Sequence, residues 1–403
     1  MTTLVSLLGR ARAHPDTGYR TATYRFPGGD ERTGPFFGLL LAEHLDAERL
    51  VILGTAGSMW DVLVEHLARH EPSRDEDERL ALYEAAQAQA VTEEHLARLQ
   101  PLVEAALGRR VDLLLIPYAR DLDEQEDLLD RLAETVRGER EIHFDVTHGL
   151  RHLPMLALVA AHLLETLDRN LAVEEIWYGA LDLTEDGRTP VLRLQGLMRL
   201  LAWSEAWRRY EDDGDYGVLA DLLEQEGVAS DRVTALRRAA HFERILDLPD
   251  ARRALQGFLP ALEAPLPGAA RLFARRLRER LDWVRHGDLY AHQRKLAFMH
   301  LGKGDYLRAA ILAVEAVLTR WMSERGEGDP NHYEDRQRAR KALREELMDA
   351  RRDDLWNDYR TLEYLRNALA HAAAPPSRRV AELLQNPERL NRELQRILSR
   401  LLT

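Results

Sequence analysis

The pattern of apolar residues changes near residue 196, and this change constrains the fold more than any other feature of the chain. Before that point, short apolar runs alternate with segments of helical period. Runs such as Leu50–Leu53 and Val111–Ile116 are almost continuously apolar, which is typical of strands covered on both faces of a parallel sheet. After that point, helical periodicity continues almost to the end. The sequence therefore predicts an α/β part with a mostly parallel, doubly wound sheet, followed by an all-α part.

Strands and helices are predicted to alternate throughout the first part. The predicted strands are Thr3–Gly9, Thr21–Phe26, Leu50–Gly54, Val111–Pro117, Glu141–Thr147, Glu175–Gly179 and Pro190–Leu194. The predicted helices are Met59–Arg69, Glu76–Leu107, Glu124–Arg137 and Pro154–Leu167. In an open sheet of this kind, ligands bind beyond the carboxyl ends of the strands.

Composition excludes several classes of protein. Apolar residues make up 45% of the 403 residues, which is enough to form a core and excludes a disordered chain. The chain holds no Cys, so disulfides, thiolate chemistry and Cys-ligated metal centres are excluded. The first residues do not form a secretory leader, and the most apolar stretch, Leu153–Leu164, is too short to span a bilayer. We therefore expect a soluble, cytoplasmic protein without a membrane partner.

Charge is distributed unevenly along the chain. The formal net charge is −12, which argues against broad binding of duplex DNA. Residues 1–195 hold 20 Lys or Arg and 35 Asp or Glu, whereas residues 196–403 hold 36 and 33. The first part therefore carries a net charge of −15 and the second part +3. The acidic character therefore belongs to the first part, whereas the second part is slightly basic, so the average over the chain does not exclude a nucleic acid there.

Three predicted strand ends carry residues suited to binding an anion. The loops Ser6–Arg10, Gly54–Met59 and Asp145–Arg151 combine Gly, hydroxyl groups and Arg at one expected edge of the sheet. Backbone N–H groups, hydroxyls and guanidinium groups in such loops bind phosphate oxygens. Neither a G-x-G-x-x-G fingerprint nor a Walker A loop is present, so ordinary dinucleotide or nucleoside triphosphate binding is not indicated. Each loop taken alone also suits an ordinary strand-to-helix turn.

A second candidate site lies on a helix predicted over residues 354–371. Arg366 falls within or beside the apolar stripe of this helix. A charged side chain at such a position must be paired with an acid, extend to solvent or serve a function. Glu363, Asn367 and His371 follow one another at intervals of four and are predicted to form one polar row. His can transfer protons near neutral pH and Arg can hold a phosphate, so the pattern suits phosphodiester cleavage. The alternative is an ordinary amphipathic helix whose Arg pairs with an acid and whose His caps carbonyls.

These motifs resemble those of a known family. Arg366-Asn367-Ala368-Leu369-Ala370-His371 matches the R-x4-H motif of HEPN ribonucleases. The segments Gly54–Trp60 and Asp145–Pro154 resemble the ligand loops of CARF domains. In this order along the chain, the motifs resemble those of CRISPR-associated CARF–HEPN ribonucleases, the ancillary effectors of type III systems.

The resemblance implies a fold, a ligand and an activity. It implies a Rossmann-like CARF sensor domain over residues 1–195, a helical connector over 196–285 and a helical HEPN ribonuclease domain over 286–403. A cyclic oligoadenylate would be the allosteric activator, with the tetra-adenylate favoured and the hexa-adenylate as the alternative. The chain would form a homodimer, or a higher oligomer, and cleave single-stranded RNA without a metal or cofactor, leaving a 2′,3′-cyclic phosphate.

The resemblance also assigns roles to residues. It assigns catalysis to Arg366, Asn367 and His371. It assigns ligand contacts to Ser6, Leu8, Gly9, Arg10, Gly54, Thr55, Ala56, Ser58, Met59, Thr147, His148, Gly149, Leu150 and Arg151. Two other functions stay open: a non-catalytic sensor that binds RNA or a protein partner, and a HEPN ribonuclease toxin that acts without a CRISPR complex. Whether the first domain also degrades its ligand, through Thr147 or His148, stays open too.

Overall fold

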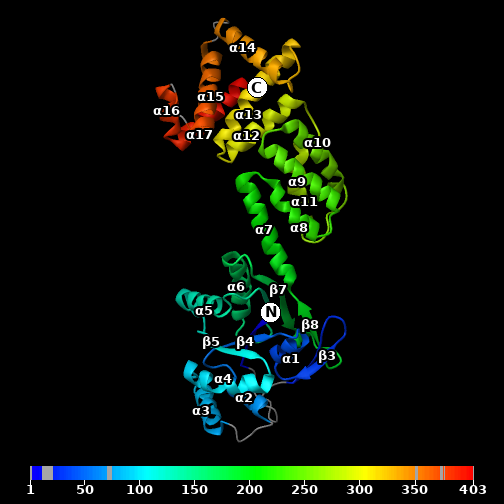
Figure 1. The fold of residues 1–403 in the computed structure, drawn as a ribbon, viewed down its shortest axis with the longest axis vertical. Helices are drawn as coiled ribbons and strands as arrows, with labels where there is room; N and C mark the ends of the chain where they lie inside the picture. Colours follow the sequence, from blue (N-terminus) through cyan, green and yellow to red (C-terminus); the bar gives the residue numbers. More distant parts are fainter. Residues whose placement is uncertain are drawn as a thin grey trace. The chain divides into compact units, whose positions relative to one another are not determined.

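A computed structural model describes residues 2–10, 21–69, 75–349, 353–372, 375 and 377–402. The chain divides into two compact units, Met1–Leu201 and Ala202–Thr403, which are described separately (Figure 1). The division falls within helix α7, Gln195–Asp213. The boundaries expected at residues 195 and 285 from the family resemblance stay predictions.

The first unit is built on a sheet that has eight strands over the described residues. Its order is β3-β2-β8-β7-β6-β1-β4-β5, and the five strands from β7 to β5 are parallel, as predicted. The antiparallel pairs are β2 with β3 and β7 with β8. The strands are β1 Thr2–Leu8, β2 Ala22–Arg25, β3 Glu31–Gly34, β4 Arg49–Gly54, β5 Arg110–Leu115, β6 Glu141–Asp145, β7 Ala172–Gly179 and β8 Arg188–Arg193.

Helices cover both faces of this sheet. Successive residues of β1 point to opposite faces, so Leu4 packs with α1 to α4 and Val5 packs with α5 and α6. Figure 1 shows α5 and α6 across the sheet from α2, α3 and α4. The predicted doubly wound α/β architecture is therefore confirmed. The helices are α1 Phe37–His44, α2 Trp60–Ala68, α3 Glu76–Gln87, α4 Glu93–Leu107, α5 Leu122–Thr135 and α6 Leu153–Leu167.

The first unit departs from the prediction in two places. The helix predicted over Glu76–Leu107 is two helices, α3 and α4. They separate because Gln89 takes a left-handed φ of 55° and the Thr92 hydroxyl accepts a hydrogen bond from the His95 N–H, which caps α4. The sequence also missed β3 and α1, since β3 has no apolar run and α1 follows it closely.

The second unit is helical throughout its described residues, as predicted. One hydrophobic cluster extends from Trp203 to Leu402 and surrounds α13, which contacts α12, α14, α15 and α17. No helix in the described part of the chain is both long and apolar enough to cross a membrane. The helices are α8 Ala220–Gln225, α9 Ser230–Arg244, α10 Leu248–Phe258, α11 Ala270–Leu281, α12 Leu289–Gly302, α13 Tyr306–Arg325, α14 Tyr333–Asp349, α15 Asp353–His371, α16 Arg378–Leu384 and α17 Pro387–Leu401.

Candidate functional site

The strand order of the first unit creates a crevice at the end of β1. Strands β4 and β5 lie on one side of β1, and β6 and β7, which come later in the chain, lie on the other. The loops that leave β4 and β6 lead to α2 and α6, which cover opposite faces of the sheet. A crevice at such a switch point is the usual ligand site of open α/β sheets.

A buried carboxylate joins the β1 and β6 ends. The Ser6 hydroxyl donates to Oδ2 of Asp145 over 2.7 Å, and the backbone N–H of Thr147 donates to Oδ1 over 2.8 Å. The Thr147 hydroxyl in turn accepts from the N–H of Gly179 over 2.8 Å. These hydrogen bonds therefore tie the ends of β1, β6 and β7 to one another.

The environment of this carboxylate disfavours its charged form. Burial raises the pKa of Asp145, against an opposing effect of the neighbouring His148. Burial likewise lowers the pKa of His148, against the opposing effect of Asp145. The fold therefore favours the neutral form of each group.

Asp145→Asn is expected to raise the free energy of unfolding at pH 8, because burial disfavours the charged carboxylate and the Asn side chain stays neutral. A folded pKa above the unfolded value means that stability is greatest below the unfolded pKa and is lost as pH rises through the folded pKa. An Asn side chain can accept from the Thr147 N–H and donate to the Ser6 hydroxyl, so the hydrogen bonds survive. Urea unfolding at pH 4.5 and pH 8 checks this, and an equal effect at both pH values would contradict it.

The β4 loop is attached to the end of β1 by backbone and side-chain hydrogen bonds. The Ser58 hydroxyl donates to the Leu8 carbonyl over 2.8 Å and accepts from the Thr55 N–H over 2.9 Å. The Met59 N–H donates to the Gly9 carbonyl over 3.1 Å. The buried Ser58 hydroxyl is thus engaged with the protein backbone, and its role is to shape the loop.

Ser58→Ala is expected to lower the free energy of unfolding by about 1–3 kcal/mol, because the buried Thr55 N–H loses its acceptor. Ser58→Thr keeps the hydroxyl and serves as the control for its loss. Chemical denaturation of both variants checks the prediction, and equal stability of Ser58→Ala and the wild type would contradict it.

Two glycines let the β1 and β6 loops approach each other. A Cβ atom on Gly9 would lie 2.6 Å from the backbone nitrogen of Gly149 and 3.2 Å from Cβ of His148. Gly149 itself has a φ of +102°, which side chains rarely allow. Glycine is therefore required at both positions of the crevice.

A pocket of about 180 Å³ opens between the three predicted loops. Half of the fourteen predicted ligand residues line it: Leu8, Gly9, Arg10, Thr55, Ser58, Gly149 and Leu150. Four further residues also line it: Gly57, Gln89, Tyr118 and Leu153.

The other predicted ligand residues lie outside this lining. Ser6 and His148 line a separate cavity of about 20 Å³ among apolar side chains. A Cβ on Gly54 would lie 2.5 Å from the ring of Trp60, so this glycine packs against α2. Met59 is buried, Thr147 is bound to Gly179, Ala56 is half-buried and Arg151 is exposed.

The sequence offered one usable signal for the residues that were missed. Tyr118 follows β5 at the same sheet edge as the other loops, so topology could have indicated it. Gln89 lies in the turn between α3 and α4, within the segment that was predicted as one continuous helix. Because a turn was not predicted there, the sequence did not indicate Gln89 as a pocket residue.

The second candidate site lies on the last two turns of α15. Tyr359, Leu362 and Leu365 are fully buried and anchor the helix, as the predicted stripe requires. Arg366 is half-buried, whereas Asn367 and His371 are exposed. The helix ends at His371, and Ala372 takes a left-handed φ of 49°.

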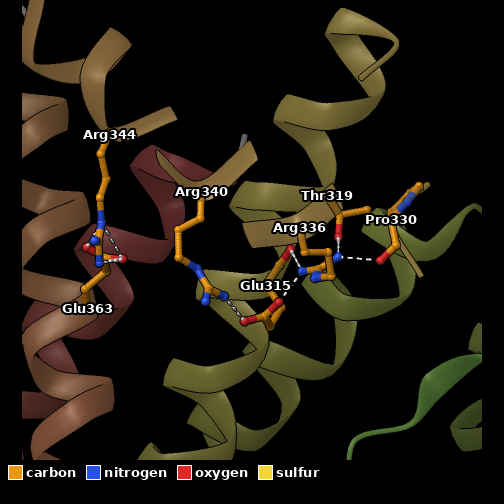
Figure 2. A network of polar contacts seen from close by, with 7 residues as sticks. All are labelled: Glu315, Thr319, Pro330, Arg336, Arg340, Arg344 and Glu363. Carbon is orange, nitrogen blue, oxygen red and sulfur yellow. Dashed lines mark hydrogen bonds and ion pairs between the residues drawn. The ribbon is translucent and has the colours of Figure 1, made fainter. Parts of the chain in front are cut away.

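One member of the predicted polar row on α15 forms an ion pair with a neighbouring helix. Glu363 is buried and its carboxylate accepts from Nη2 of Arg344 on α14 over 2.7 Å (Figure 2). Figure 2 also shows two further α14 arginines, Arg336 and Arg340, bound to Glu315 of α13. Glu363, Asn367 and His371 follow one another at intervals of four on α15 as predicted, and Glu363 is in addition bound to α14.

A second ion pair holds the other side of α15. Asp358 is buried and accepts from Nη2 of Arg396 on α17 over 2.6 Å, with Arg400 3.2 Å away. The buried acids of α15 are thus paired with arginines from neighbouring helices. Arg366 and His371 have no hydrogen-bond or ion-pair partner within the described ranges, so the alternative of an acid-paired Arg366 is not observed there.

Comparison with known proteins identifies the first unit. Residues 3–180 match the family model described as "CRISPR system endoribonuclease Csx1, CARF domain". The match places these residues of the first unit in that CARF domain family. The match covers β1 to β7 and all three predicted loops, so the predicted resemblance of those loops to a CARF domain is confirmed. It ends before α7 and does not reach α15.

Two further proteins resemble this CARF protein. The CRISPR-associated protein MJ1674 of Methanocaldococcus jannaschii is 27% identical over 243 residues, which cover 55% of this chain. The chain spans only 38% of the length of that relative. The structure of Enterococcus italicus Csm6 bound to cyclic hexa-2′-fluoro-hexa-dAMP aligns over 100% of this chain and 94% of its own, with 13% identity and a TM-score of 0.40.

Proposed function

We propose that this CARF protein is an endoribonuclease for single-stranded RNA, activated by a cyclic oligoadenylate in type III CRISPR antiviral defence in the cytoplasm. The observation that carries the proposal is the pocket that a CARF domain places at its β1/β6 switch point. Arg366, half-buried and without a partner among the described residues, lies on the same helix as His371 and supports the nuclease activity.

The pocket suits a phosphodiester ring. Arg10 supplies a positive charge at its rim, and glycines at positions 9, 57 and 149 bring backbone atoms close to a ligand. The net charge of −15 over residues 1–195 limits nonspecific attraction of long polyanions, so a compact anionic ligand is favoured. The cyclic tetra-adenylate is the favoured activator and the hexa-adenylate the alternative.

Cleavage would use groups of α15 and of the RNA itself. His371 accepts the proton of the RNA 2′-OH, whose oxygen attacks the adjacent phosphorus. The P–O5′ bond breaks, the partner subunit's His371 donates a proton to the 5′-oxygen, and a 2′,3′-cyclic phosphate is left. Arg366 holds the phosphate and stabilises its developing charge, and Asn367 orients it. The 2′-OH is the nucleophile, so this chemistry requires no metal ion.

A homodimer, with further assembly of dimers as an option, completes the proposal. The exposed face of α6 is apolar, with Met155 71% and Val159 53% exposed, and Leu150 precedes it with 44%. Such a face supports pairing with a second copy. A two-fold pair would place two pockets against one ring and two copies of His371 in one cleft.

The direct test is RNA cleavage by the purified protein, with no ring, with cyclic tetra-adenylate and with cyclic hexa-adenylate. We expect cleavage to need one of the rings and to give 2′,3′-cyclic phosphate ends. Ring binding without cleavage would favour the non-catalytic sensor, and ring-independent cleavage would favour the toxin. Sedimentation of Val159→Asp beside the wild type tests the dimer.

A further inference from the structure

One wall of the CARF pocket is formed by two side chains that lie outside the three predicted loops. Gln89 comes from the α3–α4 turn and Tyr118 from the segment between β5 and α5. Both converge on Gly57: a Cβ atom there would lie 2.7 Å from the Tyr118 hydroxyl and 3.3 Å from Oε1 of Gln89. The absence of a side chain at Gly57 therefore lets a ligand reach both polar groups.

The backbone holds Tyr118 in place. Nε2 of His152 donates to the Tyr118 carbonyl over 2.8 Å, which ties it to the β6 loop. The next residue, Ala119, takes a left-handed φ of 57°. The guanidinium of Arg120 lies 5.8 Å from the centre of the tyrosine ring. The ring is thus positioned before any ligand arrives.

The turn that carries Gln89 is similarly fixed. Gln89 has a left-handed φ of 55° and its N–H donates to the Ala86 carbonyl over 3.1 Å. The N–H of Val91 donates to the Ala56 carbonyl, which joins the turn to the β4 loop. Within the part of the chain that the structure describes, neither the Gln89 amide nor the Tyr118 hydroxyl has a hydrogen-bond partner. Both groups are therefore available to a ligand.

The chemistry of this wall differs from that of the loops. Arg10 and the glycine-rich backbone suit phosphates, which are the same whatever base they carry. A glutamine amide offers a donor beside an acceptor, which matches N7 and the N6 amino group of adenine. A tyrosine ring stacks on a base. Guanine and hypoxanthine place an oxygen where adenine has its amino group, so they would face the amide oxygen unfavourably.

We infer that Gln89 and Tyr118 bind the base in this pocket: Gln89 hydrogen-bonds to the adenine edge and sets the base specificity, and Tyr118 stacks on the base. This inference rests on the proposed cyclic oligonucleotide ligand. Contacts to the phosphates position the cyclic oligonucleotide in the pocket, and the Gln89 side chain then distinguishes its bases. Tyr118 contributes affinity for any base, whereas Gln89 contributes the preference for adenine.

The test is calorimetry of the full chain with cyclic tetra-adenylate and cyclic tetra-inosinate, which lacks the amino group. The wild type should prefer the adenylate by about 10- to 100-fold. Gln89→Leu should reduce this ratio towards one, and Tyr118→Leu should weaken both rings by about 10-fold or more with the ratio kept. Tyr83→Leu, at a tyrosine 51% exposed on α3, is the control and should change neither.

The outcomes separate this inference from the proposed function. A wild type that binds neither ring overturns the proposed ligand and the inference with it. A wild type that binds the adenylate, with Gln89→Leu keeping its full preference for adenine, overturns the inference alone. Gln89→Glu, which removes the amide donor at the same size, should also lower adenylate affinity, and unchanged affinity would overturn the inference.

Discussion

His371→Ala is expected to lower the rate of ring-activated RNA cleavage by about 10²–10⁴-fold, the usual contribution of a general acid–base group. Ring binding should be unchanged, because His371 lies outside the CARF unit. The exposed side chain has no hydrogen-bond partner within the described residues, so its removal should cost less than about 0.5 kcal/mol of stability. Single-turnover cleavage of a labelled single-stranded RNA measures the effect.

Arg366 gives a second measurement on the same helix. Arg366→Ala should lower the cleavage rate by about 10²-fold or more, and Arg366→Lys should restore only part of it, since Lys keeps the charge without the planar pair of donors. His286→Ala is a matched control, since His286 is exposed and lies outside α15. Full activity in His371→Ala, beside an unaffected His286→Ala, would contradict the site assignment.

The sheet could be predicted from the sequence because its parallel strands are buried on both faces. Leu50–Leu53 must satisfy apolar contacts in front of and behind the sheet, which leaves a continuous apolar run. Strand β3, Glu31–Gly34, is mostly exposed and pairs only at the sheet edge, so its sequence carries no such signal. Short edge strands of this kind are specified by pairing with a neighbour, which local sequence does not show.

The pocket could be predicted only as far as strand topology reaches. Parallel strands place their carboxyl ends at one edge, so the β1, β4 and β6 loops had to lie near each other. Sequence alone could not show that the Ser58 hydroxyl is engaged with Leu8 and Thr55. It also could not show that Gln89, 32 residues after Gly57, returns to the same pocket.

The polar contacts of α15 were the least predictable part of the site. Helical spacing predicts a row of Glu363, Asn367 and His371. Which side chain forms an ion pair with Glu363, however, depends on how α14 packs against α15. Arg344 lies 19 residues earlier in the chain, on another helix. Spacing along one helix therefore predicts which residues share a face, and packing against other helices decides which of them form ion pairs.

Arg344→Ala is expected to lower the free energy of unfolding by about 3 kcal/mol, because it leaves the Glu363 carboxylate buried without its cation. The Glu363 side chain is 6% exposed and that of Arg344 47%. The neighbouring Tyr359 hydroxyl is buried as well, and burial together with Glu363 raises the pKa of Tyr359. Glu363→Gln should cost only about 1 kcal/mol, because the half-exposed Arg344 can be solvated and the amide still accepts. Chemical denaturation measures both variants.

A double-mutant cycle separates the pair from its surroundings. Arg344→Leu with Glu363→Leu should recover stability to within about 1 kcal/mol of the wild type, since the double variant leaves no buried carboxylate without its cation. Arg338→Ala, at an exposed arginine on the same helix whose side chain is 70% exposed, should change stability by less than about 0.5 kcal/mol. Equal losses for Arg344→Ala and Glu363→Gln would contradict the argument. They would mean that water reaches the Glu363 carboxylate, and that the pair with Arg344 contributes little to holding α15 in place.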